Sequence, residues 1–329
     1  MILTNDQLRK TLTGVAEIDE RNGVLVPLRF GRRVRNAVYP AGNRFHGSIL
    51  HTAGVTARFV TDSITLGFDY WVSEASAAHT FDVWVNDCLL TSVHCTQISQ
   101  RAQLTLPAGE KMITVYFPYH CQARIFNIAL EDGSSFDTAP APAHRILFMG
   151  DSITHGVGAE FSSMTYPHQV ARSLNAEIVN QGIGGEGFQP LAVDHDLPFS
   201  PDLVSIAYGT NDWSHAASLG DLVGLANGHF AHLAHQYPNV PRVAILPIWR
   251  ADNDLLKATG RFEDARAAIR EAAERHGYTV VDGLLLVPHS PEFFADARLH
   301  PNALGYQFYA EHLTRRLLPL LSKFSKENI

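Results

Sequence analysis

The segment Arg145-Ile-Leu-Phe-Met-Gly-Asp-Ser-Ile-Thr-His-Gly156 decides how the second half of the chain is interpreted. Four apolar residues, Ile146 to Met149, lead directly into Gly150-Asp151-Ser152. A short apolar run that ends at a turn signal is typical of a buried parallel strand. Ser152 is therefore expected at the carboxyl end of a strand, the edge at which open α/β sheets bind ligands. We interpret Ser152 as a candidate nucleophile.

From Arg145 onward, segments with strand and helix patterns alternate. The expected strands are 146–149, 176–180, 203–208, 242–247 and 279–282. The expected helices are 165–174, 219–236, 262–275 and 301–321. This alternation predicts an α/β fold in which a parallel sheet carries helices on both faces.

The first part of the chain has a different pattern. Short runs rich in Val, Ile, Thr and Phe alternate with turn residues at 55–60, 63–68, 81–85, 102–106, 112–117 and 123–130. Such spacing predicts an all-β sandwich of the jelly-roll kind. Before it, Thr4 is expected to cap a short helix over residues 6–12.

Residues 131–144 are polar and then rich in Pro and Ala, a composition typical of a linker. We therefore predict a sandwich domain over residues 1–138, a linker over 139–144 and a catalytic domain over 145–329. For the sandwich, three roles stay open: glycan binding, dimer contacts, or a wall of the active site.

Composition narrows the class of protein. The 329 residues are 46% hydrophobic and 18% charged, as in folded proteins, and the length favours two domains. The net charge of −7 argues against general nucleic-acid binding. No apolar run reaches the length of a membrane span, and the N-terminal residues do not resemble a signal peptide, so a cytoplasmic location is expected. A homo-oligomer is compatible with this composition.

Two local features lie outside this pattern. Cys88, Cys95 and Cys121 are odd in number and lack metal-ligand spacing, so we expect buried thiols in a reducing compartment. The segment Arg29-Phe-Gly-Arg-Arg-Val-Arg35 is basic. It is compatible with a site for an anionic ligand or with the solvated face of a strand.

Polar or glycine-rich segments follow three expected strands, and a histidine comes later. Ser152 needs a base to remove its proton. The glycine-rich loop ending at Gly185 offers backbone N–H groups, and Asn211 offers an amide, so both can stabilise an oxyanion. His300 lies just before the last expected helix and is the candidate general base.

These segments, in this order, resemble the SGNH (GDSL-type) hydrolase superfamily. The matching blocks are Gly-Asp-Ser-Ile at 150–153, the glycine loop ending at 185, Gly-Thr-Asn-Asp at 209–212 and His-Pro-Asn at 300–302. The resemblance implies a flavodoxin-like α/β/α domain in which Ser152 is the nucleophile and His300 is the base. It also implies an oxyanion hole made by the N–H groups of Ser152 and Gly185 and by the Asn211 amide. A preceding β-sandwich resembles the two-domain carbohydrate esterases and related acyltransferases of this superfamily.

One position departs from the family pattern. The residue three before the histidine is usually an aspartate that orients the imidazole, and here it is Ala297. Asp296 lies one residue earlier. Either a shifted turn lets Asp296 reach His300, or the enzyme works with a Ser–His dyad.

Four further residues near the blocks are candidates for substrate contact. They are Asp151, Trp213, Trp249 and Arg250. Asp151 is equally compatible with a helix-start role, and Trp213 with core packing. No cluster of His, Cys or Asp has metal-ligand spacing, and the chemistry requires no metal or cofactor.

The sequence therefore favours a serine esterase that hydrolyses small O-acyl esters, with acetyl groups on carbohydrate as the expected substrate. An O-acyltransferase with the same Ser–His chemistry is one alternative. A non-catalytic carbohydrate-binding protein is another, which the intact Ser152, Gly185, Asn211 and His300 set disfavours.

Overall fold

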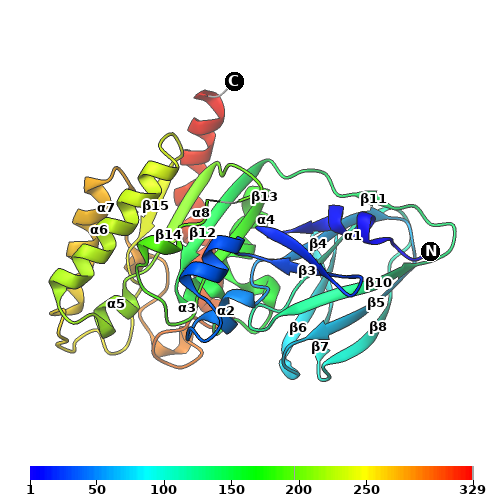
Figure 1. Cartoon of the computed structure of the whole chain (residues 1–329), viewed down its shortest axis with the longest axis horizontal. Helices are drawn as coiled ribbons and strands as arrows, with labels where there is room; N and C mark the ends of the chain where they lie inside the picture. The colour runs from blue at the N-terminus through cyan, green and yellow to red at the C-terminus, as the bar shows by residue number, and fades with distance from the viewer. Residues whose placement is uncertain (196, 328–329) are drawn as a thin grey trace.

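The chain folds into a β-rich part followed by a parallel-sheet part (Figure 1). The computed structural model describes residues 1–195 and 197–327, and side chains up to residue 322. Among these residues, no helix is both long and apolar enough to span a bilayer.

Two antiparallel sheets build the β-rich part. The larger sheet contains, in order, β1 (Leu12–Thr13), β4 (Thr56–Thr61), β9 (Lys111–Tyr116), β6 (Ser76–Val85) and β7 (Cys88–Cys95), and β11 (Asp137–Thr138) also pairs with β4. The smaller contains β10 (Ala123–Leu130), β5 (Thr65–Val72) and β8 (Ser99–Thr105). A separate hairpin joins β2 (Glu17–Arg21) to β3 (Val24–Leu28).

The strand pattern explains why the sheets pack together. Along β5, Leu66, Phe68, Tyr70 and Val72 recur at every second position, and all are buried. They join buried residues of the larger sheet, such as Phe81, in one apolar core. The predicted sandwich is therefore confirmed. The prediction missed β7 and the β2–β3 hairpin.

Short helices accompany these sheets. They are α1 (Asn5–Thr11), the π-helical turn η1 (Val34–Val38) and α2 (His46–Leu50). Thr4 is the N-cap of α1, as expected, and Gln7 completes a capping box with it. In Figure 1, α2 lies beside α3 (Ser152–His155) of the parallel-sheet part, and the His51 and His155 ring centroids are 5.3 Å apart.

The second part contains a five-stranded parallel sheet. Its strands are β12 (His144–Gly150), β13 (Ala176–Gly182), β14 (Leu203–Ala207), β15 (Arg242–Ile245) and β16 (Thr279–Val281), in the order β13-β12-β14-β15-β16. This is the order of flavodoxin-like sheets. The predicted α/β class is confirmed.

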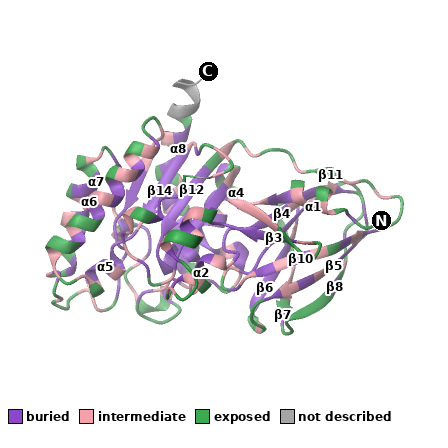
Figure 2. Ribbon diagram, in the orientation of Figure 1, coloured by how far each residue is buried: buried purple, intermediate pink, exposed green. Residues whose placement is uncertain are grey.

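Helices cover both faces of this sheet. One face packs against α4 (Tyr166–Leu174) and α8 (Ala303–Glu327), and the other packs against α6 (Leu219–Gln236) and α7 (Phe262–Arg275). Two short helices, α3 (Ser152–His155) and α5 (Thr210–His215), follow β12 and β14. The 3-10 turns are η2 (Ser162–Met164), η3 (Pro190–Ala192), η4 (Gly283–Leu285) and η5 (Pro291–Phe293). Figure 2 shows β12 and β14 of this sheet buried and the outer sides of α6 and α7 exposed.

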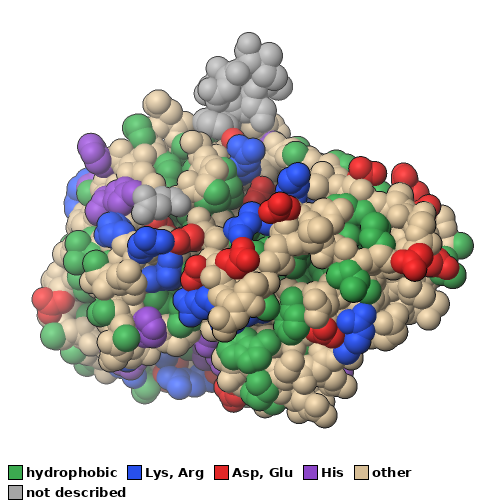
Figure 3. Space-filling view, turned by 45° about the vertical axis from the view of Figure 1, so that its right-hand side comes forward, with side chains coloured by type: hydrophobic (Ala, Val, Ile, Leu, Met, Phe, Trp, Pro, Cys, Tyr) green, Lys and Arg blue, Asp and Glu red, His purple; other side chains and the backbone are tan. Residues whose placement is uncertain are grey.

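Polar contacts join the two parts. The Arg172 guanidinium of α4 lies 4.3 Å from the Trp84 ring centroid of β6. The Ser163 N–H donates to Asp82 at 2.8 Å, and the Tyr119 hydroxyl donates to the Ala159 carbonyl at 3.0 Å. Figure 3 shows acidic and basic side chains together over the middle of the face it presents.

Two sequence-based expectations are wrong. Cys88 is exposed, because it begins the edge strand β7, whereas Cys95 and Cys121 are buried free thiols as expected. The basic segment 29–35 is not a solvated strand face. Arg29 is fully buried, and Arg35 pairs with Glu17.

Candidate active site

Ser152 lies at the turn from β12 into α3. Asp151 is the N-cap of α3, and its Oδ1 atom accepts the Ile153 N–H at 2.9 Å. Gly150 is needed before this turn, because an added Cβ would lie 2.1 Å from the Thr154 hydroxyl oxygen. The turn therefore projects Ser152 from the carboxyl edge of the sheet, and its residue surface is 6% exposed.

His300 approaches Ser152 from the segment that precedes α8. Its Nε2 atom lies 2.9 Å from the Ser152 Oγ atom. Asn302 closes this segment, because its side chain accepts the Gly305 N–H at 3.0 Å in the first turn of α8. Residues 148 positions apart are thus brought into hydrogen-bond contact, a geometry suited to proton transfer.

Asp296 contacts the opposite side of the imidazole. Its Oδ2 atom lies 2.7 Å from His300 Nδ1. Its Oδ1 atom accepts the N–H groups of Arg298, Leu299 and His300 at 3.0, 2.8 and 3.1 Å. Ala297 has a left-handed φ of 55°. The turn at Ala297 brings Asp296 to the imidazole, although Asp296 lies one residue before the position of the family's aspartate.

The Asp296 carboxylate is held in its ionised form. Partial burial raises its pKa. The hydrogen bonds from the Leu299 N–H and the His300 imidazole have a larger, opposite effect and lower the pKa to about 2. A carboxylate at this position fixes the imidazole tautomer with Nδ1 protonated and leaves Nε2 as the acceptor for the serine proton.

The glycine loop and Asn211 meet beside Ser152. An added Cβ on Gly184 would lie 3.9 Å from Ser152 Cβ. Gly185 has a φ of 79°, and no described group accepts its N–H. The Asn211 amide, from the first turn of α5, donates to the Glu186 carbonyl at 2.9 Å. The structure thus brings Ser152, Gly185 and Asn211 to one edge of the sheet.

The β-rich part also borders this loop. An added Cβ on Gly185 would lie 3.7 Å from the Phe45 ring. His155, three residues after Ser152, accepts the Gly184 N–H at its Nδ1 atom and contacts the Tyr119 carbonyl through Nε2 at 2.9 Å. Side chains and carbonyls from residues before the linker therefore touch the elements that carry the candidate site.

The structure places the four candidates for substrate contact in different surroundings. Trp213 is 0% exposed in the core and donates to the Gly260 carbonyl, and Arg250 is 2% exposed, so neither side chain meets solvent. Asp151 is buried as a helix cap. Trp249 is partly buried, stacks on His289 and packs against Phe294 near the segment that carries Asp296.

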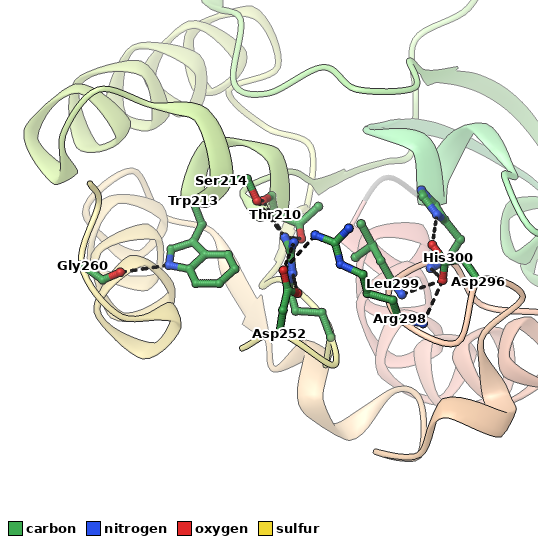
Figure 4. A network of polar contacts seen from close by, with 10 residues as sticks. Thr210, Trp213, Ser214, Asp252, Gly260, Asp296, Arg298, Leu299 and His300 are labelled. Atoms are coloured by element: carbon green, nitrogen blue, oxygen red, sulfur yellow. Dashed lines mark hydrogen bonds and ion pairs between the residues drawn. The ribbon is translucent and has the colours of Figure 1, made fainter. Parts of the chain in front are cut away.

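Arg250 organises a network that the sequence did not reveal (Figure 4). Its guanidinium donates to the Thr210 carbonyl and hydroxyl and to the Ser214 hydroxyl of α5. It also pairs with Asp252, which pairs with Arg298 in turn. The network connects α5, which carries Asn211, to the segment that carries His300.

Other polar residues have structural contacts. Asp212 accepts the Phe188 N–H at 2.9 Å and so ties α5 to the glycine loop. Within the described residues, no group of three or more His, Cys, Asp or Glu side chains is arranged to hold a metal ion.

The parallel-sheet part of the chain is similar to a known protein family. Residues 148–308 match the model of the GDSL-like Lipase/Acylhydrolase family. No curated protein sequence matches the chain.

Solved structures match both parts of the chain. The salicylyl-acyltransferase SsfX3 from a tetracycline biosynthetic pathway is 24% identical, has a TM-score of 0.79, and is matched over 94% of each chain. An acetyl xylan esterase from the rumen bacterium Butyrivibrio proteoclasticus is 15% identical, with a TM-score of 0.65 over 95% of this chain and 96% of that chain. A family two carbohydrate esterase from Clostridium thermocellum, in complex with cellohexaose, is 20% identical, with a TM-score of 0.66 over 83% of this chain and 94% of that chain. These likenesses show a shared two-part fold.

Proposed function

We propose that this chain, whose residues 148–308 form a GDSL-like lipase/acylhydrolase domain, is a serine esterase that removes small O-acyl groups, acetyl above all, from carbohydrate. One observation carries the proposal. A continuous hydrogen-bonded series runs from Ser152 Oγ through His300 to Asp296, at 2.9 and 2.7 Å. A buried serine in contact with a base that a carboxylate orients is the arrangement that makes a hydroxyl nucleophilic.

The first half of the reaction forms an acyl-enzyme. His300 Nε2 takes the proton of Ser152 as Oγ bonds to the ester carbonyl carbon. The resulting oxyanion accepts hydrogen bonds from the N–H groups of Ser152 and Gly185 and from the Asn211 amide. His300 then gives its proton to the alkoxy oxygen, and the bond between the acyl carbon and that oxygen breaks.

The second half releases the acid. Water enters beside His300, which takes one proton as the water oxygen bonds to the acyl carbon. Collapse of the second tetrahedral intermediate breaks the bond to Ser152 Oγ, and His300 returns the proton to that atom. Asp296 remains ionised throughout, because its pKa is held at about 2.

The carbohydrate part of the proposal is supported by two of the similar structures. One is described as an acetyl xylan esterase, and another is a carbohydrate esterase solved with cellohexaose. Their identities to this chain are 15% and 20%, so the substrate requires a direct assay.

The assay compares 4-nitrophenyl esters of increasing acyl length with acetylated xylo- and cello-oligosaccharides. Wild type, Ser152→Ala and the control Ser173→Ala are measured together, because Ser173 is an exposed serine of α4. We expect wild type and the control to release acetate at equal rates and Ser152→Ala to be inactive. Equal turnover by Ser152→Ala would rule out the serine mechanism.

An O-acyltransferase is the second candidate, because SsfX3 is matched over 94% of each chain. In the same assay, the ratio of free acid to 4-nitrophenol is measured with sugar alcohols or phenols added as acceptors. A hydrolase keeps this ratio near one, whereas a transferase moves the acyl group into a new ester and lowers it.

A further inference from the structure

Arg29 is a fully buried arginine that crosses from the β-rich part to the parallel sheet. It follows β3 and is 0% exposed. Its Nε and Nη2 atoms donate to the carbonyls of His51 and Ser48 at 2.9 and 2.6 Å. Its Nη1 atom donates to the carbonyls of Asn180 and Gly182 at 2.9 and 2.6 Å. One guanidinium therefore joins the end of α2 to the end of β13.

This cation is buried without a countercharge in contact. None of the described carboxylates forms an ion pair with Arg29, and all four of its hydrogen-bond acceptors are backbone carbonyls. Burial lowers its pKa to about 9, which leaves it charged at neutral pH. Burying a charge without a counterion costs free energy. A buried guanidinium is therefore tolerated only where its hydrogen-bond acceptors are held at fixed positions around it.

Two of the four carbonyls that Arg29 holds, those of Asn180 and Gly182, belong to the last three residues of β13, directly before the glycine loop. Gly182 ends β13, and Ile183-Gly184-Gly185 follows it directly. Asn180 is held in a second way, because its side-chain amide donates to the Thr154 carbonyl at 2.8 Å. The strand end that precedes Gly185 is thus fixed on both sides.

His155 holds the same loop one step further on. The Gly184 N–H donates to its Nδ1 atom at 3.2 Å, which requires that nitrogen to be unprotonated. Burial, and next the nearby charge of Arg29, lower the pKa of His155 well below its ordinary value. Arg29 therefore favours the neutral imidazole that the Gly184 contact needs.

We propose that Arg29 is a positioning residue for the oxyanion hole: its contacts with the carbonyls of Asn180 and Gly182 fix the direction of the Gly185 N–H. The inference rests on the proposed function, in which that N–H stabilises the oxyanion. A small displacement of such a donor slows the chemical step much more than it weakens substrate binding.

The test compares Arg29→Met and Arg29→Lys with the control Arg33→Met. Arg33 comes from the same segment and also donates to backbone carbonyls of the parallel-sheet part, those of Leu191 and Val193, but not to the strand end before the glycine loop. Lysine keeps the charge but cannot reproduce the four contacts of a guanidinium fork. It also serves as the second variant if Arg29→Met does not fold, as judged by circular dichroism and thermal melting.

For folded variants of Arg29 we expect kcat to fall roughly 10- to 100-fold with KM changed less than about threefold. Arg33→Met should stay within about twofold of wild type in both constants. A double-mutant cycle combines Arg29→Lys with Asn211→Ala. The fold-loss of kcat in the double variant should be smaller than the product of the two single fold-losses, because both residues act on the same oxyanion. Independent, multiplicative effects or an unchanged kcat would overturn the inference.

A second measurement does not depend on turnover. Amide hydrogen exchange over residues 183–186 should be faster in Arg29→Lys than in wild type and unchanged in Arg33→Met. Unchanged exchange in Arg29→Lys contradicts the positioning role, even if the chain proves inactive. Absence of Ser152-dependent turnover in wild type contradicts the proposed function instead, so the two failures are distinguishable.

Discussion

The Asp296 Oδ2 atom lies 2.7 Å from His300 Nδ1, although an alanine occupies the position where the family pattern has its acid. Ala297 has a φ of 55°, and the turn it forms brings the carboxylate one residue earlier in the chain to the imidazole. The same carboxylate accepts three consecutive backbone N–H groups, from Arg298 to His300. The contact is thus built into the turn.

The first prediction concerns Asp296→Asn. Asparagine can still accept the backbone N–H groups at one oxygen, but it removes the charge that stabilises the imidazolium. We expect kcat to fall roughly 10³- to 10⁴-fold with little change in KM. Since the pKa of Asp296 is held at about 2, the wild-type carboxylate is ionised at every pH of the assay, and the comparison is made at pH 8, in the same buffer for both proteins. A kcat within about tenfold of wild type would favour a Ser–His dyad.

The second prediction concerns the turn itself. A left-handed φ strains an alanine but not a glycine. Ala297→Gly should therefore leave kcat unchanged and raise the free energy of unfolding by at most about 1 kcal/mol. Ala297→Val should lower the free energy of unfolding by roughly 1–2 kcal/mol, because a β-branched residue is poorly tolerated there. Urea denaturation of the three proteins measures both differences. If valine is as stable as glycine, the left-handed turn is not present in solution.

The strand-end residues could be predicted from sequence for a physical reason. In a parallel sheet all carboxyl ends lie at one edge, so Ser152, Gly185 and Asn211 had to be neighbours once their strands were identified. The spacing of short apolar runs and turn residues likewise predicted the β-sandwich. These inferences need only the local pattern and the sheet topology.

The burial of arginine could not be predicted in this way. Arginine is usually exposed, so the sequence gives no sign that Arg29 and Arg250 are buried. Their hydrogen-bond acceptors are backbone carbonyls or side chains up to about 150 residues away in sequence. A sequence shows neither which carbonyls converge nor where they lie. The Asp296 contact was undecided for a related reason, because it depends on a single backbone dihedral angle at Ala297.

The third prediction concerns Asp151, the buried cap of α3. Burial, with a smaller contribution from Asp212, raises its pKa from 3.8 to about 7. Between these values the unfolded chain has lost the proton and the folded chain keeps it, so this group makes stability fall as pH rises. Asparagine keeps the capping oxygen but does not titrate.

We therefore expect the free energy of unfolding of Asp151→Asn, relative to wild type, to increase from about pH 4 to about pH 7 and then to level off. Guanidinium denaturation at several pH values measures the difference. Asp87→Asn is a matched control, because Asp87 is exposed in the β6–β7 turn, and it should show no such trend. A constant difference for Asp151→Asn across this range would mean that the carboxyl is ionised throughout.

The fourth prediction separates the two arginines that hold Asp252. Burial raises the pKa of Asp252, but the hydrogen bonds from Arg250 and Arg298 lower it well below its ordinary range. The Arg250 side chain is 2% exposed and contacts both Asp252 oxygens, whereas the Arg298 side chain is 55% exposed and contacts one. Arg250→Met breaks the buried pair and also removes one hydrogen-bond donor from the Thr210 carbonyl and from the Ser214 hydroxyl.

We expect Arg250→Met to lower the free energy of unfolding by about 3 kcal/mol and Arg298→Met by less than about 1 kcal/mol. Because Arg250 holds α5, which carries Asn211, its loss should also lower kcat, whereas Arg298→Met should leave kcat nearly unchanged. Urea denaturation and steady-state kinetics on the two variants measure these differences. Equal losses of stability would mean that burial adds nothing to the Arg250 pair, and an unaltered kcat in Arg250→Met would mean that Asn211 is positioned by the glycine loop alone.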